Sequence, residues 1–169
     1  MSRSVPLTAR SPHPLPAILS AFRDEDYWHS RLGAFEGGSP TLDALDTDSA
    51  GRTTVAMTMR FGGDQLPDPI RRLRLVSLEI VQRETWFPVD DGDGARGEIT
   101  VHAPRTPMSG RGLVDLAPDG PGTRLVGTAT VTVKVPLIGG TIATFVAGQL
   151  ATGIVDVVTV TDAWLSESR

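Results

Sequence analysis

The fold of this chain is decided by residues 123–164, whose sequence is TRLVGTATVTVKVPLIGGTIATFVAGQLATGIVDVVTVTDAW. Before Pro136, side chains alternate as on a strand with one apolar face and one mostly polar face. The apolar face holds Leu125, Ala129, Val131, Val133 and Val135, and the other face holds Val126, Thr128, Thr130, Thr132 and Lys134. After Pro136, apolar residues recur every three or four positions as far as Trp164. This change of period predicts a strand over 123–135 and a long helix over 138–166.

The same patterns predict the rest of the chain. Alternation bounded by turn residues predicts strands at 3–11, 40–48, 52–61, 78–89, 95–103 and 111–117, the pattern at 40–48 being the weakest. Prolines at 12, 14 and 16 open a short helix that ends near Phe22. A second short helix is predicted over 25–32, with Asp24 as its N-cap and Gly33 as its stop, and a single helical turn over 70–75.

This order of elements predicts an α+β architecture. An antiparallel sheet with one apolar face needs a cover, and the long C-terminal helix is the element large enough to supply it. We therefore expect a curved antiparallel sheet of about six to seven strands wrapped around that helix. The length of 169 residues suits a single domain over residues 1–169.

Composition excludes several chemistries. The chain has no cysteine, which excludes disulfides, thiolate nucleophiles and cysteine-ligated metals. Its three histidines, His13, His29 and His102, are scattered, so we expect no metal site and no cofactor. The net charge of −4 argues against a nucleic-acid partner. The N-terminus lacks a secretory signal pattern, and a cytoplasmic location is expected.

The uncharged stretch 137–155 is nearly as long as a membrane span, which needs about 20 mainly apolar residues. It contains three threonines, Gln149 and four glycines, and Asp156 follows it directly. We therefore expect a helix held by the rest of the domain, not a membrane span. The four glycines, Gly139, Gly140, Gly148 and Gly153, each disfavour helix by about 1 kcal/mol relative to alanine. Close packing on the sheet, or space for a ligand, is expected to offset that cost.

Four local runs carry a resemblance. They are AFRDEDYWHSRL (21–32), ETWFPV (84–89), VTVKVPLIGG (131–140) and FVAGQLATGI (145–154). With the order of elements, they resemble an uncharacterised actinobacterial family within the START superfamily, also called SRPBCC, which includes the birch-pollen allergen and has the helix-grip fold. The resemblance covers nearly the whole chain. It implies a ligand held between the sheet and the long helix, in a superfamily whose members bind lipids, hormones and polyketides or act as cyclases.

On that arrangement, the pocket wall includes Met57, Met59 and Phe61 from strand 52–61, and Phe145 from the long helix. Methionine adapts to irregular apolar ligands, although ordinary core packing is the alternative. Gln149 lies among apolar residues and is a candidate hydrogen-bonding anchor, or it bonds a neighbouring carbonyl. Tyr27 and Trp28 are expected near the pocket mouth; alternatively, their rings cap one end of the core.

Strand 78–89 has two possible inward faces. One face carries Gln82, Glu84 and Trp86, and the other carries Arg83; we favour the Trp86 face, with a solvated strand as the alternative. A buried Glu84 would need a partner or a raised pKa, which makes Glu84, with Tyr27, a weak candidate for general acid–base catalysis. The predicted ligand-binding set is Tyr27, Trp28, Met57, Met59, Phe61, Gln82, Trp86, Phe145 and Gln149.

These features support three hypotheses. The leading one is a non-enzymatic binding protein for a small hydrophobic molecule, lipid-like or polyketide-like, and a closed interior would count against it. The second is an enzyme of the polyketide cyclase or dehydratase kind that uses Glu84 or Tyr27. The third is a homodimer or partner-binding module with a closed core.

Overall fold

The computed structural model describes residues 1–34, 38–62, 64, 66, 68–71, 74, 77–89, 93–104 and 106–167. Its elements follow the predicted order. They are β1 (Ser2–Ser11), α1 (Leu15–Phe22), α2 (Glu25–Gly33), β2 (Ser39–Thr47), β3 (Thr53–Gly62), α3 (Asp68–Arg71), β4 (Ser77–Pro88), β5 (Ala95–His102), β6 (Met108–Asp119), β7 (Gly122–Val133) and α4 (Gly139–Glu167).

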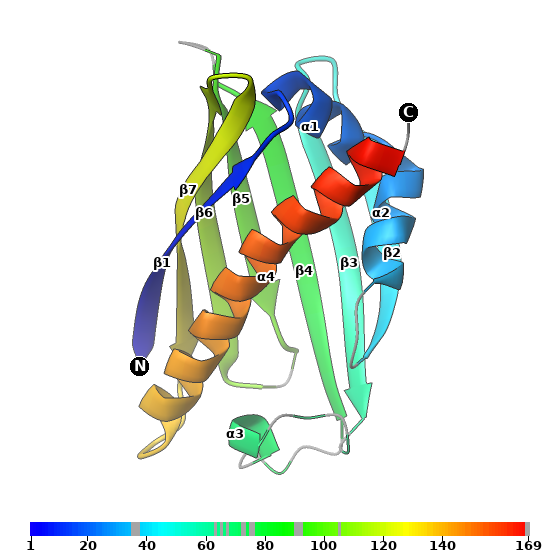
Figure 1. The fold of residues 1–169 in the computed structure, drawn as a ribbon. Coiled ribbons are helices and arrows are strands. Elements are labelled where there is room, and N and C mark those ends of the chain that lie inside the picture. Colours follow the sequence, from blue (N-terminus) through cyan, green and yellow to red (C-terminus); the bar gives the residue numbers. More distant parts are fainter. Residues whose placement is uncertain are drawn as a thin grey trace.

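The strands form one antiparallel sheet of seven strands in the order β1-β7-β6-β5-β4-β3-β2. Figure 1 shows α4 crossing one face of the curved sheet, with α1 and α2 beside its C-terminal end. The helix packs mainly on β1 and β7. The predicted α+β architecture, a curved sheet around a long terminal helix with two short helices after the first strand, is confirmed.

Burial follows the alternation of each strand. On β7, Leu125, Ala129 and Val131 are buried against the core, whereas Val126 is 47% exposed on the opposite face. On β4, Glu84 and Trp86 are buried and Arg83 is exposed, so the strand turns its Trp86 face inward. A solvated strand is therefore excluded for the central part of β4.

Local signals fix the ends of the short helices. The side chain of Asp24 accepts a hydrogen bond of 2.9 Å from the backbone N–H of Asp26, and α2 ends at Gly33. The turn expected over 70–75 begins earlier, as α3 over Asp68–Arg71; residues 72, 73 and 75 lie outside the described residues. The strand expected over 111–117 is longer, because β6 pairs along its whole length with β7.

The expectation that the four glycines of α4 allow close packing on the sheet is wrong for two of them. A methyl group added at Gly148 or Gly153 would meet nothing within 4 Å, so neither position serves close packing on the sheet. At Gly139 and Gly140 the neighbouring atoms are close, with the carbonyl oxygen of Val133 and the sulfur of Met1 about 3 Å from where a methyl group would lie. Close packing therefore accounts only for the two glycines at the start of α4.

Helix α4 has the length and composition of a membrane-spanning helix, with a mean hydropathy of 1.6 in its most apolar window. In this fold its inner face packs on the sheet, as expected for a core helix. The buried side chains form two clusters. The first surrounds α1, α2 and the C-terminal half of α4, and the second lies towards α3 and the first half of α4.

Candidate functional site

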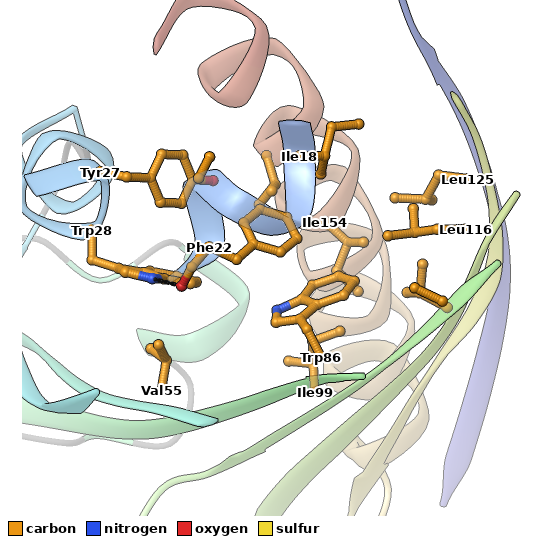
Figure 2. Close-up of a cluster of buried hydrophobic side chains, with 14 of the residues drawn as sticks. Ile18, Phe22, Tyr27, Trp28, Val55, Trp86, Ile99, Leu116, Leu125 and Ile154 are labelled. Carbon is orange, nitrogen blue, oxygen red and sulfur yellow. Dashed lines mark hydrogen bonds between the residues drawn. The ribbon is translucent and has the colours of Figure 1, made fainter. Parts of the chain in front are cut away.

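A cavity of about 20 Å³ lies between the sheet, α1 and the C-terminal half of α4. Figure 2 shows Ile18 and Phe22 of α1 pointing into this region, towards Trp86, Leu116 and Leu125 of the sheet. Its lining consists of Ser11, Ile18, Phe22, Trp86, Leu116, Thr123, Leu125, Val157, Val158, Thr161 and Asp162. The site is thus apolar over most of its wall, with four polar residues at one side.

The size of the cavity decides what it holds without rearrangement. A space of about 10–15 Å³ accommodates one water molecule, whereas pockets for drug-sized ligands measure about 300–1,000 Å³. At about 20 Å³, this cavity is close to the size of a single water. The closed form therefore counts against a preformed lipid-sized pocket, because Ile18 and Phe22 fill the space that a larger ligand would need.

Helix α1 separates this cavity from an open surface groove. The groove measures about 240 Å³ and is lined by Leu15, Pro16, Leu19, Arg23, Pro88, Asp93 and Gly94. Ile18 and Phe22, four residues apart, face the cavity, whereas Leu15, Leu19 and Arg23 face the groove. One short helix is therefore the partition between the outside and the interior.

The polar side of the cavity is tied together by hydrogen bonds. The hydroxyl of Ser11 donates to Oδ1 of Asp162 at 2.5 Å and accepts from the backbone N–H of His13 at 3.1 Å. The hydroxyl of Thr123 donates to the carbonyl oxygen of His13 at 2.9 Å. These bonds join the end of β1 to β7 and α4 at the edge of the cavity.

Tyr27 is fully buried beside this region, but it does not line the cavity. Its hydroxyl lies 2.7 Å from that of Thr161, which donates to the carbonyl oxygen of Val157. A threonine hydroxyl has one hydrogen, so Tyr27 is the donor in this pair. Burial raises the pKa of Tyr27 above its ordinary value of 10, although the charge of Arg31 and the bond to Thr161 oppose the shift. The ring and its proton are thus held in place.

Glu84, whose side chain is 1% exposed, is surrounded by donors. Arg31 of α2 forms two hydrogen bonds with it, of 3.2 Å to Oε1 and 2.7 Å to Oε2. Trp86 Nε1 donates to Oε1 at 3.0 Å, and Gln82 Nε2 donates to Oε2 at 2.7 Å. The carboxylate therefore receives four hydrogen bonds, which is about its full capacity.

Arg31 is the cation that the buried carboxylate requires. Its guanidinium lies 4.6 Å from the ring centroid of Trp28, a cation–π arrangement. Burial acts to lower the pKa of Arg31, but the negative charge of Glu84 and the neighbouring Tyr27 outweigh it, so the pKa is raised. The pair is thus a stable internal ion pair between α2 and β4.

The other residues of the predicted binding set are dispersed. Met57 packs in the first core cluster, and Phe61 and Phe145 pack against the second. Met59 is partly buried on β3. The sequence makes Gln149 a candidate hydrogen-bonding anchor inside the pocket. It lies exposed on α4 instead. The helix presents Ala147 and Ala151 to the sheet side, which turns Gln149 outward.

Of the predicted binding set, Gln82 and Trp86 both bond to the catalytic candidate Glu84, and Tyr27 and Trp28 lie around Arg31. Sequence reasoning did not find the cavity residues Ser11, Thr161 and Asp162. Spacing carries no signal for them, because they lie at the far ends of the chain. Arg31 could be sought as the partner of a buried Glu84 only once the inward face of β4 is known. Among the described residues, no group of three or more His, Asp or Glu is placed to hold a metal.

The curved sheet gripping a terminal helix is the helix-grip fold of the START superfamily. The chain belongs to the family described as "Protein of unknown function (DUF2505)", whose model matches residues 7–165. A relative is the uncharacterised protein Rv0481c of Mycobacterium tuberculosis, 26% identical over 157 residues, which cover 89% of this chain and 90% of the relative. The predicted resemblance to an uncharacterised family is confirmed, with a mycobacterial relative, and the fold is that of the START superfamily.

Three solved structures share the fold. TTHA0849 of Thermus thermophilus has a TM-score of 0.62 and 16% identity, with 98% of this chain and 99% of that chain covered. A START superfamily protein of Mycobacterium smegmatis has a TM-score of 0.56 and 12% identity, covering 98% and 99%. The Zhui aromatase/cyclase of Streptomyces has a TM-score of 0.57 and 10% identity, covering 98% and 94%. At these identities the likeness is one of fold.

Proposed function

We propose that this protein is a non-enzymatic binding protein for a small hydrophobic molecule held between the sheet and α4. The observation that carries the proposal is the apolar wall of Trp86, Leu116 and Val157 beneath α4, which α1 separates from an open groove of about 240 Å³. A lipid-like or polyketide-like molecule suits this wall, since the apolar surface it covers is removed from water on binding.

Binding of such a ligand requires α1 to move. The helix has eight residues, and no side chain caps its first turn. A helix this short depends on its packing and has little stability of its own. Displacement of Ile18 and Phe22 would merge the cavity with the groove of about 240 Å³ on the other side of α1. The closed interior is then the ligand-free state of the site.

The test is a screen of lipids and aromatic polyketides by native mass spectrometry and thermal shift. We expect at least one class to form a one-to-one complex and to raise the melting temperature, because a ligand that binds only the folded state stabilises it. Val157→Ile adds one methylene group at the cavity wall and should reduce that shift. Val126→Ile adds the same group on the exposed face of β7 and should leave it unchanged.

A screen without any complex, together with a dimer in light scattering, would overturn the proposal. That result would favour the third hypothesis, a homodimer or partner-binding module with a closed core. A complex formed equally by the wild type and by Val157→Ile would move the binding site away from the cavity. One domain over residues 1–169 and a cytoplasmic location remain predictions, which limited proteolysis and cell fractionation test.

The enzyme hypothesis has less support from the geometry. A general acid or base must reach the reacting atom and exchange a proton with it. Glu84 already accepts four hydrogen bonds, and the hydroxyl of Tyr27 is bonded to Thr161 and lies outside the cavity lining. Glu84 and Tyr27, the two residues predicted for acid–base catalysis, are therefore not placed for the chemistry of an aromatase/cyclase.

A further inference from the structure

The polar side of the cavity carries one negative charge. Asp162 of α4 contributes a carboxylate to the lining, and the cavity lining among the described residues includes neither arginine nor lysine. None of the ion pairs within the described part of the chain involves Asp162. The partner of its Oδ1 is the neutral hydroxyl of Ser11. Within the part of the chain that the structure describes, no contact with a cation neutralises the charge of Asp162.

The helix on which Asp162 lies adds to this negative field. Asp162 is five residues before the end of α4, and the last turn of the helix has no basic residue. The unpaired carbonyl groups at a helix C-terminus carry a partial negative charge of about half an elementary charge. The helix end thus has the same sign of charge as the carboxylate, and its effect decreases within about one turn.

The buried cation Arg31 does not compensate for this field. Arg31 is paired through two hydrogen bonds with Glu84, so the two charges largely cancel at the distance of the cavity. Asp162 is half-buried, so water screens its charge less than that of a fully exposed group, and the repulsion of a like charge is larger than in bulk water. A ligand anion beside Asp162 would meet repulsion without a matching cation.

We propose that the cavity selects hydrophobic ligands whose polar end is a hydrogen-bond donor, an alcohol or an ammonium group, and rejects those that end in a carboxylate. This inference rests on the proposed binding function. Oδ2 of Asp162 has no hydrogen-bond partner among the described residues, so a ligand donor at this side can bond to the same carboxylate that holds Ser11.

The experiment compares three probes of equal chain length: 1-octanol, octylamine and octanoate. Binding is measured by titration calorimetry at neutral pH and low salt, where the amine is cationic and the acid is anionic. We expect octanoate to bind at least about tenfold more weakly than octanol, and octylamine to bind no more weakly than octanol.

Two variants separate the local charge from the net charge of the protein. Asp162→Asn keeps the shape of the side chain and removes its charge. The ratio of the dissociation constants of octanoate and octanol should therefore fall to about threefold or less. Asp156→Asn removes one charge from the exposed face of the same helix and should leave the order of the probes unchanged. Circular dichroism and the melting temperature establish that both variants are folded.

A third variant covers the case in which Asp162→Asn fails to fold. Ser11→Ala leaves the carboxylate without its internal donor, and it should increase the preference for octanol over octanoate. Equal binding of all three probes by the wild type would overturn the charge selection and leave the proposed binding function standing. Binding of none of them would overturn the charge selection, whereas the binding function would be overturned by the failure of the lipid and polyketide screen.

Discussion

The indole ring of Trp86 on β4 lies directly over the backbone of Gly97, its partner across the ladder on β5. A methyl group at Gly97 would overlap the six-membered ring of the indole. Gly97→Ala should therefore displace Trp86 from its contact with Phe22, whose ring centroid lies 4.8 Å away, and from its hydrogen bond to Glu84. We expect a loss of about 1–3 kcal/mol in the free energy of unfolding by urea, with a shifted tryptophan emission. An unchanged stability would show that the ring moves aside without cost.

The same substitution at two glycines of α4 should change the free energy of unfolding in the opposite direction. Gly148 and Gly153 have open space around the position of an added methyl group. Alanine in a helix is favoured over glycine by about 1 kcal/mol, because glycine has more conformational freedom in the unfolded chain. Gly148→Ala and Gly153→Ala should each raise the free energy of unfolding by about that amount. Destabilisation by either variant would indicate a contact of α4 that this structure does not include.

The ion pair of Arg31 with Glu84 should be costly to break from one side. Arg31→Met leaves the carboxylate of Glu84 buried without a cation, and we expect a loss of about 3–5 kcal/mol in urea denaturation. Arg96→Met breaks the exposed pair with Asp115 and should cost at most about 1 kcal/mol. Arg31→Met with Glu84→Leu should recover much of the loss, since neither charge is then buried alone. A double variant as unstable as the single one would refute this explanation.

Tyr27 should make the protein sensitive to alkali. Its folded pKa is raised above 10, so the folded state holds the phenolic proton more tightly than the unfolded chain does. The resulting contribution to stability is complete below pH 10 and is lost as the pH rises through the folded pKa, because the unfolded state releases its proton first. Above pH 10, the wild type should thus lose stability more steeply than Tyr27→Phe.

The measurement is urea denaturation at several alkaline pH values. The chain has a single tyrosine, so absorbance of the phenolate reports on Tyr27 alone. At neutral pH, Tyr27→Phe should lower the free energy of unfolding by about 1 kcal/mol. This is the usual contribution of one hydrogen bond, which here is the bond with Thr161. Parallel pH profiles of the two proteins would contradict a raised pKa.

Helix α1 should be the first covering element of the cavity to open. It is short, lacks a side-chain cap and packs on the cavity through Ile18 and Phe22, whereas α4 packs along β1 and β7. Amide hydrogen exchange should therefore be faster in α1 than in the buried half of α4. A bound hydrophobic ligand should slow exchange in α1 more than in β2. Equal protection of α1 and α4 without ligand would contradict the opening of the site at α1.

The sequence by itself determined the architecture. Alternation along residues 123–135 and the change of period after Pro136 are local consequences of how strands and helices present their side chains. The apolar face of the sheet must pack against another element, and α4 is the element long enough to cover it. The order of elements therefore predicted a sheet that curves around α4. The sequence tied the direction of Glu84 to that of Trp86, two residues further along the same strand face, but it left two possible inward faces, and the structure shows that the Trp86 face is the inner one.

Only the tertiary structure decided the contacts within that architecture. Arg31 meets Glu84 across 53 residues, and Tyr27 meets Thr161 across 134 residues. Such contacts depend on how far long side chains reach between packed elements, and the periodicity of the sequence contains no information about that reach. The outward position of Gln149 and the open surroundings of Gly153 depend on how α4 is rotated against the sheet. The closed cavity was likewise decided by the tertiary structure. Its volume is the small difference between the space that the backbone leaves and the volume that Ile18, Phe22 and their neighbours fill.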